Sequence, residues 1–189
     1  MTGVTEHSAG VGLDARPFAK GLVQIYTGNG KGKTTAALGL ALRAAGHGLR
    51  VYFGQFMKGV PYGELSALVQ LPSVTIRQFG AQRWTHPEDV TAEDRALAQV
   101  GLQECTEVLH SGGYDVVVLD EINVAAAWGL LPVDQVACLV LAKPAGVELI
   151  LTGRYVPERI LRLADLVTEM NEIKHPFSSG ITSRQGIEF

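Results

Sequence analysis

Residues 27–35 read TGNGKGKTT, a stretch suited to binding phosphate groups. Lys33 supplies an ammonium group for phosphate, and Thr34 supplies a hydroxyl group for Mg²⁺. Three alternate positions lack side chains, which allows backbone N–H groups to turn toward an anion; these are Gly28, Gly30 and Gly32. Thr27 stands where the common G-x-x-x-x-G-K-[ST] pattern begins with glycine, so the entry to the loop is expected to differ slightly. The stretch predicts a nucleoside triphosphate site.

A carboxylate partner for the metal should stand at the end of a neighbouring strand, and residues 114–121, YDVVVLDE, provide one. The β-branched run is typical of a strand buried on both faces. Asp120 or Glu121 could bind Mg²⁺ directly or through water; alternatively, the acidic pair only marks the start of a helix. With Thr34 these two residues form the predicted metal site. The predicted catalytic residues are Lys33, Thr34 and Glu121.

Alternating strand and helix patterns must position these side chains. Apolar, strand-like runs occupy residues 21–26, 49–56, 114–121, 147–153 and 165–170. Helical patterns occupy residues 34–46, 91–113, 132–143 and 156–164. The first helix is apolar on nearly every face and is predicted to be buried, and Thr91 with Asp94 predicts a capping box at the start of the second. The alternation predicts an α/β protein with a mainly parallel sheet, helices on both faces and a RecA-like P-loop nucleotide-binding fold.

Composition limits the class of protein. The 189 residues are 47% hydrophobic and 19% charged, which suits a globular chain. We expect a flexible arm over residues 1–20 and one domain over residues 21–189. The net charge of −3 gives no overall attraction to nucleic acid or to an anionic membrane. No membrane-spanning run or secretory signal is seen, so we expect a cytoplasmic protein in which Cys105 and Cys138 are buried thiols.

Motifs along nearly the whole chain resemble one family. They are residues 26–48, QFMKG at 55–59, GE at 63–64, VVVLDEINVA at 116–125, LTGR at 151–154, ADLVTEM at 164–170 and KHPFSSGITSRQGIEF at 174–189. In this order they are similar to the ATP:corrinoid adenosyltransferases of the CobA/BtuR type, from about Gly21 to Phe189. Threonine at the first loop position is typical of that family. The role of the segment 174–189 is not apparent from its residue types.

The resemblance implies an unusual use of ATP. In this family, cobalt(I) of a corrinoid attacks the 5′ carbon of ATP, the adenosyl group moves to cobalt, and the whole triphosphate leaves. A leaving group with several negative charges needs Mg²⁺, a lysine and backbone amides, and no general base is required because cobalt is the nucleophile. The resemblance also implies a reduced flavoprotein as electron donor and a homodimer.

The corrinoid side of the site is implied by the same resemblance. Trp84 aligns with an aromatic residue that lies near the corrin in the family, although an ordinary half-buried tryptophan is the alternative. The family has phenylalanine two places earlier, where this chain has Gln82, so Phe79 or Phe53 would have to compensate. We expect His86 to be a surface residue, because a strong axial ligand opposes the four-coordinate cobalt that is easiest to reduce.

The predicted ATP-binding residues are those of the loop and one arginine that follows a strand. They are Gly28, Asn29, Gly30, Lys31, Gly32, Lys33, Thr34, Thr35 and Arg154. For Arg154 a surface ion pair is the alternative, and Glu64 could either contact ribose or fix a loop. We expect Lys58 to be a solvated lysine at a strand end.

Two other function classes are compatible with a phosphate loop. One is a phosphoryl-transfer enzyme, either a small-molecule kinase or an ATPase, which would release ADP or pyrophosphate. The other is a nucleotide-gated binding module, such as a RecA-type partner of DNA. The net charge and the lack of a Lys/Arg stripe disfavour DNA binding.

Overall fold

The computed structural model describes residues 17–83 and 86–188. Its centre is a six-stranded sheet in the order β3-β2-β4-β5-β1-β6, and each neighbouring pair is parallel. The strands are β1 Val23–Thr27, β2 Val51–Phe56, β3 Val74–Phe79, β4 Val116–Asp120, β5 Glu148–Thr152 and β6 Leu166–Glu169. The predicted α/β fold with a parallel sheet is confirmed.

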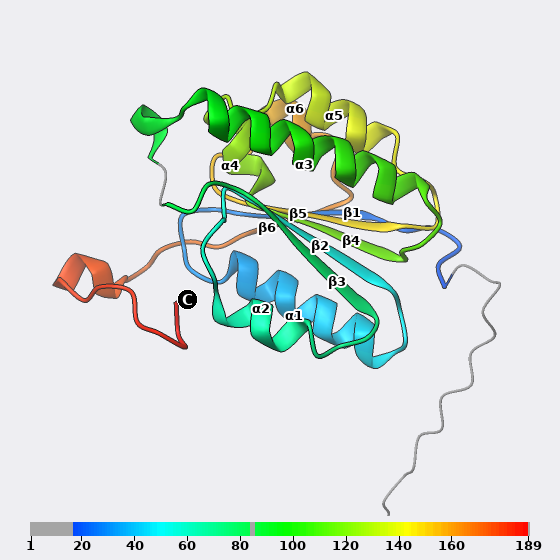
Figure 1. Ribbon diagram of the computed structural model, residues 1–189, viewed down its shortest axis with the longest axis horizontal. Coiled ribbons are helices and arrows are strands. Elements are labelled where there is room, and N and C mark those ends of the chain that lie inside the picture. The colour runs from blue at the N-terminus through cyan, green and yellow to red at the C-terminus, as the bar shows by residue number, and fades with distance from the viewer. Residues whose placement is uncertain (1–16, 84–85, 189) are drawn as a thin grey trace, which may run out of the picture.

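Helices cover both faces of the sheet (Figure 1). One face carries α1 Lys33–Gly46 and α2 Gly63–Leu68, and the other carries α3 Ala92–His110, α4 Ile122–Ala127, α5 Val133–Leu141 and α6 Glu158–Leu161. Two 3₁₀ helices, η1 Pro87–Asp89 and η2 Pro176–Ser179, lie outside these layers. The sequence patterns did not predict α2, β3 or α4.

The core consists of two apolar layers, one on each face of the sheet. Side chains alternate along each strand, so Leu119 packs with the layer under α3 to α6, whereas Val118 packs with the layer under α1 and α2. The buried side of α1 is a stripe of small residues, Ala37, Ala41 and Ala44. Leu42 on the same helix is 58% exposed. The prediction that this helix is buried on nearly every face is therefore wrong.

Local signals elsewhere behave as the sequence predicts. Thr91 and Asp94 form the predicted capping box at the start of α3, with the backbone N–H of each residue bonded to the side chain of the other. All five residues of β4 and all six of β2 are buried, as expected for central strands of a parallel sheet. By contrast, all four residues of β6 are exposed at its edge of the sheet.

The strand order places one end of each central strand at the same edge of the sheet. Thr27 ends β1, Thr152 ends β5 and Asp120 ends β4, and these three strands are neighbours. The chain after β6 leaves the sheet, passes through η2 and returns to end near the start of α1 (Figure 1). Ligands of open α/β sheets bind at this carboxyl edge.

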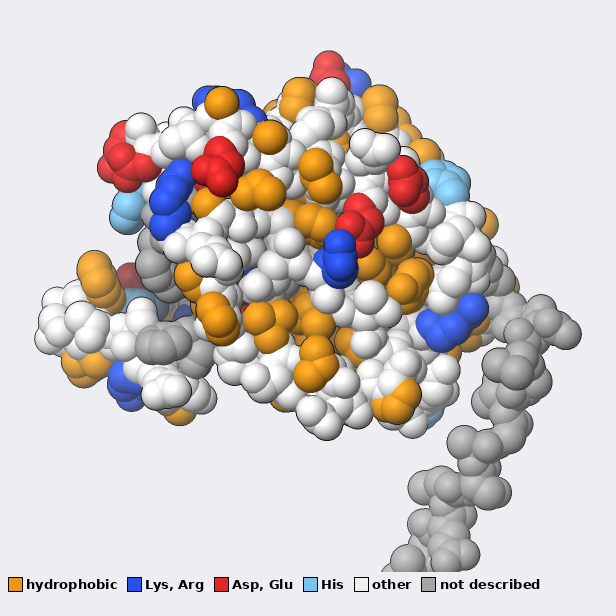
Figure 2. Space-filling view, viewed as in Figure 1, with side chains coloured by type: hydrophobic (Ala, Val, Ile, Leu, Met, Phe, Trp, Pro, Cys, Tyr) orange, Lys and Arg blue, Asp and Glu red, His pale blue; other side chains and the backbone are white. Residues whose placement is uncertain are grey.

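Other expectations concern the surface. Cys105 is a buried free thiol as predicted, but Cys138 is exposed on α5, because it lies on the side of that helix turned from the sheet. On the face in Figure 2, acidic and basic side chains are scattered among apolar ones, without a continuous stripe of Lys and Arg among the described residues. Within the described ranges, no helix has the length and hydropathy needed to cross a membrane.

Candidate nucleotide site

The glycine-rich loop between β1 and α1 is held in shape by the chain that follows β6. Gly28 has a φ of 92°, a conformation that side chains disfavour. A Cβ atom on Gly28 would lie 2.4 Å from the carbonyl oxygen of Met170, and one on Gly30 would lie 2.7 Å from it. The N–H of Gly30 donates to this same oxygen at 2.6 Å. These two glycines therefore allow a close backbone contact as well as the predicted approach of phosphate.

Lys33 points into the curve of the loop. Its side chain is buried, and Nζ donates to the carbonyl oxygens of Gly28 at 2.8 Å and Gly30 at 2.7 Å. Burial lowers the pKa of Lys33, and the positive charge of Arg154 lowers it further. The ammonium group is therefore already in the loop, where a phosphate group can replace the two carbonyl oxygens as its partner.

Asp120 is the centre of a buried hydrogen-bond network. Its side chain is 0% exposed. Its Oδ1 accepts hydrogen bonds from the hydroxyl groups of Thr34 at 2.9 Å and Thr152 at 2.6 Å. Its Oδ2 accepts from Lys58 Nζ at 2.9 Å and from Gln55 Nε2 at 3.3 Å. The predicted pairing of Thr34 with the carboxylate at the end of β4 is thus present in the geometry.

These groups are compatible with Mg²⁺. The Thr34 hydroxyl and the Asp120 carboxylate are hard oxygen donors that already contact each other. Among residues 17–83 and 86–188, no cluster of three or more His, Cys, Asp or Glu side chains forms a closed metal cage. Mg²⁺ usually retains water and takes phosphate oxygens as ligands, so two protein donors beside a phosphate loop are sufficient.

Glu121 has a backbone conformation that is uncommon for residues other than glycine. Its φ is 61° and its ψ is 13°, in the left-handed region, and its N–H donates to the hydroxyl group of Thr152 at 3.0 Å. The side chain lines the cavity that opens over the loop. Desolvation, and then the neighbouring charge of Asp120, raise the pKa of Glu121 to about 7. Such strain and such a shift are frequent at functional sites.

Glu121→Gln should make the stability of the free protein less dependent on pH. Because the folded-state pKa is raised from 4.5 to about 7, the folded protein binds more protons than the unfolded chain in that window. Stability therefore falls as pH rises through it. In the variant, the free energy of unfolding should fall less steeply with pH, by up to about 1.4 kcal/mol per pH unit. The variant should therefore be more stable than the wild type at pH 8. Urea unfolding between pH 5 and pH 8, without metal or nucleotide, measures this, and parallel curves for the two proteins would contradict it.

A cavity of about 670 Å³ opens over the loop and the start of α1. Its polar walls come from distant parts of the chain: loop residues 30–35, Lys58, Glu64, Glu121, Arg154, His175 and Ser183. The C-terminal segment closes one side, with Gly186, Ile187 and Glu188 in the wall. Lys31 Nζ lies 2.8 Å from Glu188 Oε1, and Arg184 also pairs with Glu188. Residue types alone assigned no role to this segment, although its motif resembled the family.

Some of the residues predicted to bind ATP line this cavity, and others do not. Lys31, Thr35 and Arg154, three of the predicted ATP-binding residues, line the same cavity as Lys33 and Thr34. Gly28, which is half-buried, and Asn29, which is exposed, do not line the cavity. His86 is exposed, as expected.

Two interpretations need correction. Phe79 is only 5% exposed and packs in the core with its ring centroid 5.6 Å from that of Phe56, because it faces inward from β3 toward α3. It does not line the cavity, and Phe53 is fully buried on the other layer, so neither can form an aromatic wall in this structure. Lys58 is not solvated: its side chain is 13% exposed. Trp84 lies outside the described residues.

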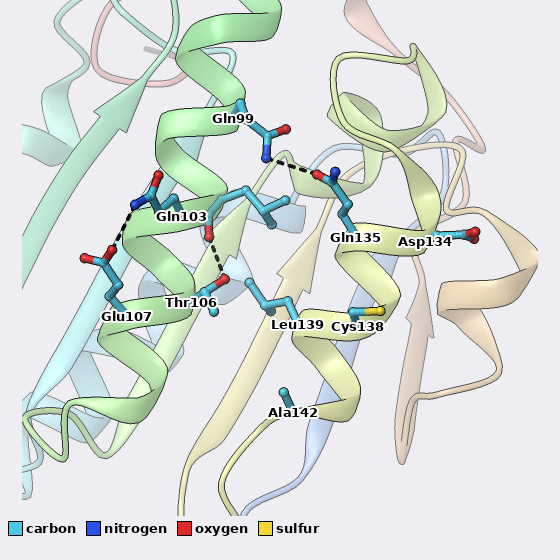
Figure 3. A pocket seen from close by; sticks show the side chains of 10 residues that line it. Gln99, Gln103, Thr106, Glu107, Asp134, Gln135, Cys138, Leu139 and Ala142 are labelled. Atoms are coloured by element: carbon cyan, nitrogen blue, oxygen red, sulfur yellow. Dashed lines mark hydrogen bonds between the residues drawn. The ribbon is translucent and has the colours of Figure 1, made fainter.

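A second cavity, of about 580 Å³, lies between α3 and α5 (Figure 3). Its walls contain neutral amides that pair with other side chains, with Gln99 donating to Gln135 at 3.0 Å and Gln103 donating to Glu107 at 3.1 Å. Cys138 is at its rim, with the sulfur pointing away from α3 (Figure 3). Among the residues that the structure describes, no lysine or arginine lines this cavity, so it lacks the cations that a triphosphate site needs.

The fold and the first cavity define a P-loop nucleotide-binding α/β protein. A glycine-rich loop joins a central strand to a helix, and its threonine contacts a carboxylate at the end of β4. Residues 19–189 match the model of the family described as ATP:corrinoid adenosyltransferase BtuR/CobO/CobP, and the chain belongs to this family. The resemblance carried by the motifs is thereby confirmed, and with it the class of an ATP-dependent transferase.

Relatives at moderate identity agree with the family. The chain is 38% identical to the corrinoid adenosyltransferase CobA of Salmonella typhimurium, over 90% of this chain and 86% of that protein. It is 37% identical to the corrinoid adenosyltransferase of Escherichia coli K12, again over 90% and 86%. It is 34% identical to the corrinoid adenosyltransferase of Pseudomonas aeruginosa, over 90% and 84%. The similarity therefore extends over most of both chains in each comparison.

Proposed function

We propose that this protein transfers the 5′-deoxyadenosyl group of ATP to the cobalt(I) of a corrinoid and releases triphosphate, as a step in adenosylcobalamin biosynthesis. The observation that carries the proposal is the contact of Thr34 with Asp120 beside Lys33, at the loop of a domain that matches this family throughout. In the reaction a cobalt–carbon bond forms at C5′, the bond between C5′ and its oxygen breaks, and that electron pair leaves with the triphosphate.

The residues of the loop act on the leaving group. Backbone N–H groups and the N-terminus of α1 place positive partial charge on the phosphates. Lys33 adds a full charge, and Arg154, which follows β5 and also lines the cavity, adds a second. Charge that develops as the bond breaks is stabilised most by groups that are positioned in advance. The hydrogen bonds from Lys33 Nζ to the carbonyl oxygens of Gly28 and Gly30 support such positioning.

Thr34 and Asp120 are the proposed holders of Mg²⁺, with Glu121 facing the same cavity. The ion would neutralise phosphate charge when bound. The network through Thr152 and Gln55 fixes the orientation of the Asp120 carboxylate before any ligand arrives. Such supporting hydrogen bonds orient metal-binding side chains.

The remaining parts of the proposal concern partners. Trp84 stays the proposed aromatic neighbour of the corrin, whereas Phe79 is withdrawn. A reduced flavoprotein is the proposed electron donor, and the cytoplasm is the proposed location. A homodimer is proposed because β6 and the chain after it expose a group of large apolar side chains, which pairing of subunits would cover: Leu166, Val167, Ile173 and Phe177.

The products of ATP test the function. With ATP, Mg²⁺ and chemically reduced corrinoid, we expect equal amounts of adenosylated corrinoid and intact triphosphate, measured by absorbance and by ion chromatography or phosphorus NMR. A reaction without corrinoid is the control and should leave ATP intact. Accumulation of ADP or pyrophosphate alone would favour the phosphoryl-transfer class instead. ATP-dependent, salt-sensitive binding to DNA would favour the binding module.

A further inference from the structure

Lys58 is the unexpected member of the cavity wall. It follows β2, and its Nζ lies 2.9 Å from Asp120 Oδ2 and 3.5 Å from Glu64 Oε1. The ammonium group also lies 4.7 Å from the centroid of the Tyr62 ring, a cation–π distance. Three different contacts thus hold one buried cation at the carboxyl edge of the sheet, next to the proposed metal site.

The charges around the cavity explain why a cation is needed there. Glu64 and Glu121 line the cavity that must accept a triphosphate, and buried Asp120 lies directly behind its wall, bonded to the hydroxyl group of Thr34. A further lining carboxylate, Glu188, is already paired with Lys31 and Arg184. A buried carboxylate is stable only with charged or hydrogen-bonding partners. Lys33 is turned into the loop and bonds carbonyl oxygens, and Lys58 is the cation that forms an ion pair with Asp120 among the described residues.

The position of Lys58 is fixed by neighbouring amides. Gln78 on β3 donates to Gln55 Oε1 at 3.1 Å, and Gln55 Nε2 donates to both Glu64 at 3.1 Å and Asp120. The two carboxylates that contact Lys58 are therefore linked to each other through Gln55. If the Lys58 ammonium group moved from Asp120 toward Glu64, it would still lie in the same cavity.

We propose that Lys58 is a positioning residue for the nucleotide: an internal counter-cation that neutralises Asp120 until a metal ion arrives and so lets triphosphate enter the acidic cavity. This inference rests on the proposed ATP site. The metal ion and the Lys58 ammonium group can therefore partly substitute for each other in neutralising the Asp120 carboxylate. Without metal, loss of Lys58 leaves the negative charge of Asp120 without a counter-charge beneath the cavity wall, where it would repel the phosphates; with Mg²⁺ bound, the ion supplies the missing charge.

Lys58→Gln isolates this charge, because the amide can still donate a hydrogen bond to Asp120. Dissociation constants for ATP are measured by calorimetry with excess Mg²⁺ and with EDTA. We expect the ratio of the metal-free to the metal-bound constant to rise about tenfold or more in the variant, since one full charge a few ångströms from Asp120 is lost. Lys58→Arg keeps the charge and should bring the ratio close to the wild-type value.

Two further variants serve as controls. Lys20→Met also removes one positive charge, but from a side chain 73% exposed beside Asp165, so the ratio should not change. In an Asp120→Asn background, Lys58→Gln should raise the ratio much less than in the wild type, because the Asp120 carboxylate that Lys58 neutralises is absent. The double variant removes both charges of the Lys58–Asp120 ion pair, so neither is left buried without a partner. It should therefore fold even if the protein with Lys58→Gln alone does not. Circular dichroism checks the folding of each variant.

The outcomes separate this inference from the proposed function. Equal loss of affinity with and without Mg²⁺ in Lys58→Gln, or an unchanged ratio, would overturn the role of Lys58 while leaving the ATP site in place. Failure of the wild type to bind ATP under either condition would overturn the ATP site itself.

Discussion

Lys33→Ala is expected to lower the rate of adenosyl transfer by about 10²–10³-fold, the equivalent of about 2.7–4 kcal/mol of transition-state stabilisation. Lys33 is buried in the loop curve, where its two carbonyl partners hold Nζ ready for phosphate. Removing it takes away a full positive charge that is positioned in advance in the loop for the departing triphosphate. The measurement is the steady-state rate with pre-reduced corrinoid, so that reduction of cobalt does not limit the result.

Lys20→Ala is the matched control for Lys33→Ala. It makes the same substitution at an exposed lysine at the opposite end of the sheet, beside Asp165, and should keep the wild-type rate. Thermal unfolding of both variants excludes a general loss of structure. Turnover of Lys33→Ala within a few-fold of the wild type would mean that the loop amides and Arg154 suffice, and the role assigned to Lys33 would be wrong.

Gly28→Ala should damage both the fold around the loop and nucleotide binding. The residue has a φ of 92°, and the new Cβ would lie 2.4 Å from the Met170 carbonyl oxygen. Either the loop or the chain after β6 must move, which would break the bond from Gly30 N–H to Met170. We expect the free energy of unfolding to fall by about 2 kcal/mol or more and ATP affinity to fall more than about tenfold. Urea unfolding and calorimetry measure the two effects.

Gly39→Ala provides the control within the next element. Gly39 is exposed in the middle of α1, and a Cβ atom added to it would meet no neighbouring atom within 4 Å. Alanine there should stabilise the protein by about 0.5–1 kcal/mol, because it favours the helix over the unfolded chain. If Gly28→Ala behaved like Gly39→Ala in stability and ATP binding, the close approach of Met170 would not be what requires glycine in the loop.

The parts of the fold that were predictable from sequence are those with strong local patterns. The five predicted strands correspond to β1, β2, β4, β5 and β6. Each was predictable because its residues form an apolar, strand-like run in the sequence. β3 was missed because it is an edge strand in which Thr75 and Gln78 interrupt the apolar pattern. The helices α2 and α4 have six residues each, too few to show a helical period.

The residues of the site also differ in whether a local sequence pattern predicts them. Lys33 and Thr34 are neighbours in sequence, so a short motif was sufficient to find them. Lys58 meets Asp120 only because β2 and β4 pair in parallel with Gln55 opposite Asp120, a register that no local pattern reveals. Phe79 was misassigned because residue type does not tell which face of an edge strand a side chain occupies.

The contact between Gly30 and Met170 has a consequence for synthesis of the chain. The loop at residues 27–35 leaves the ribosome early, but its backbone partner lies far along the chain at Met170 and is made much later, and Glu188, which pairs with Lys31, is made later still. A nascent chain halted after β5 would carry the complete loop sequence without the oxygen atom that Gly30 binds. Such a chain should hold ATP poorly, which delays use of the nucleotide until the domain has been fully translated.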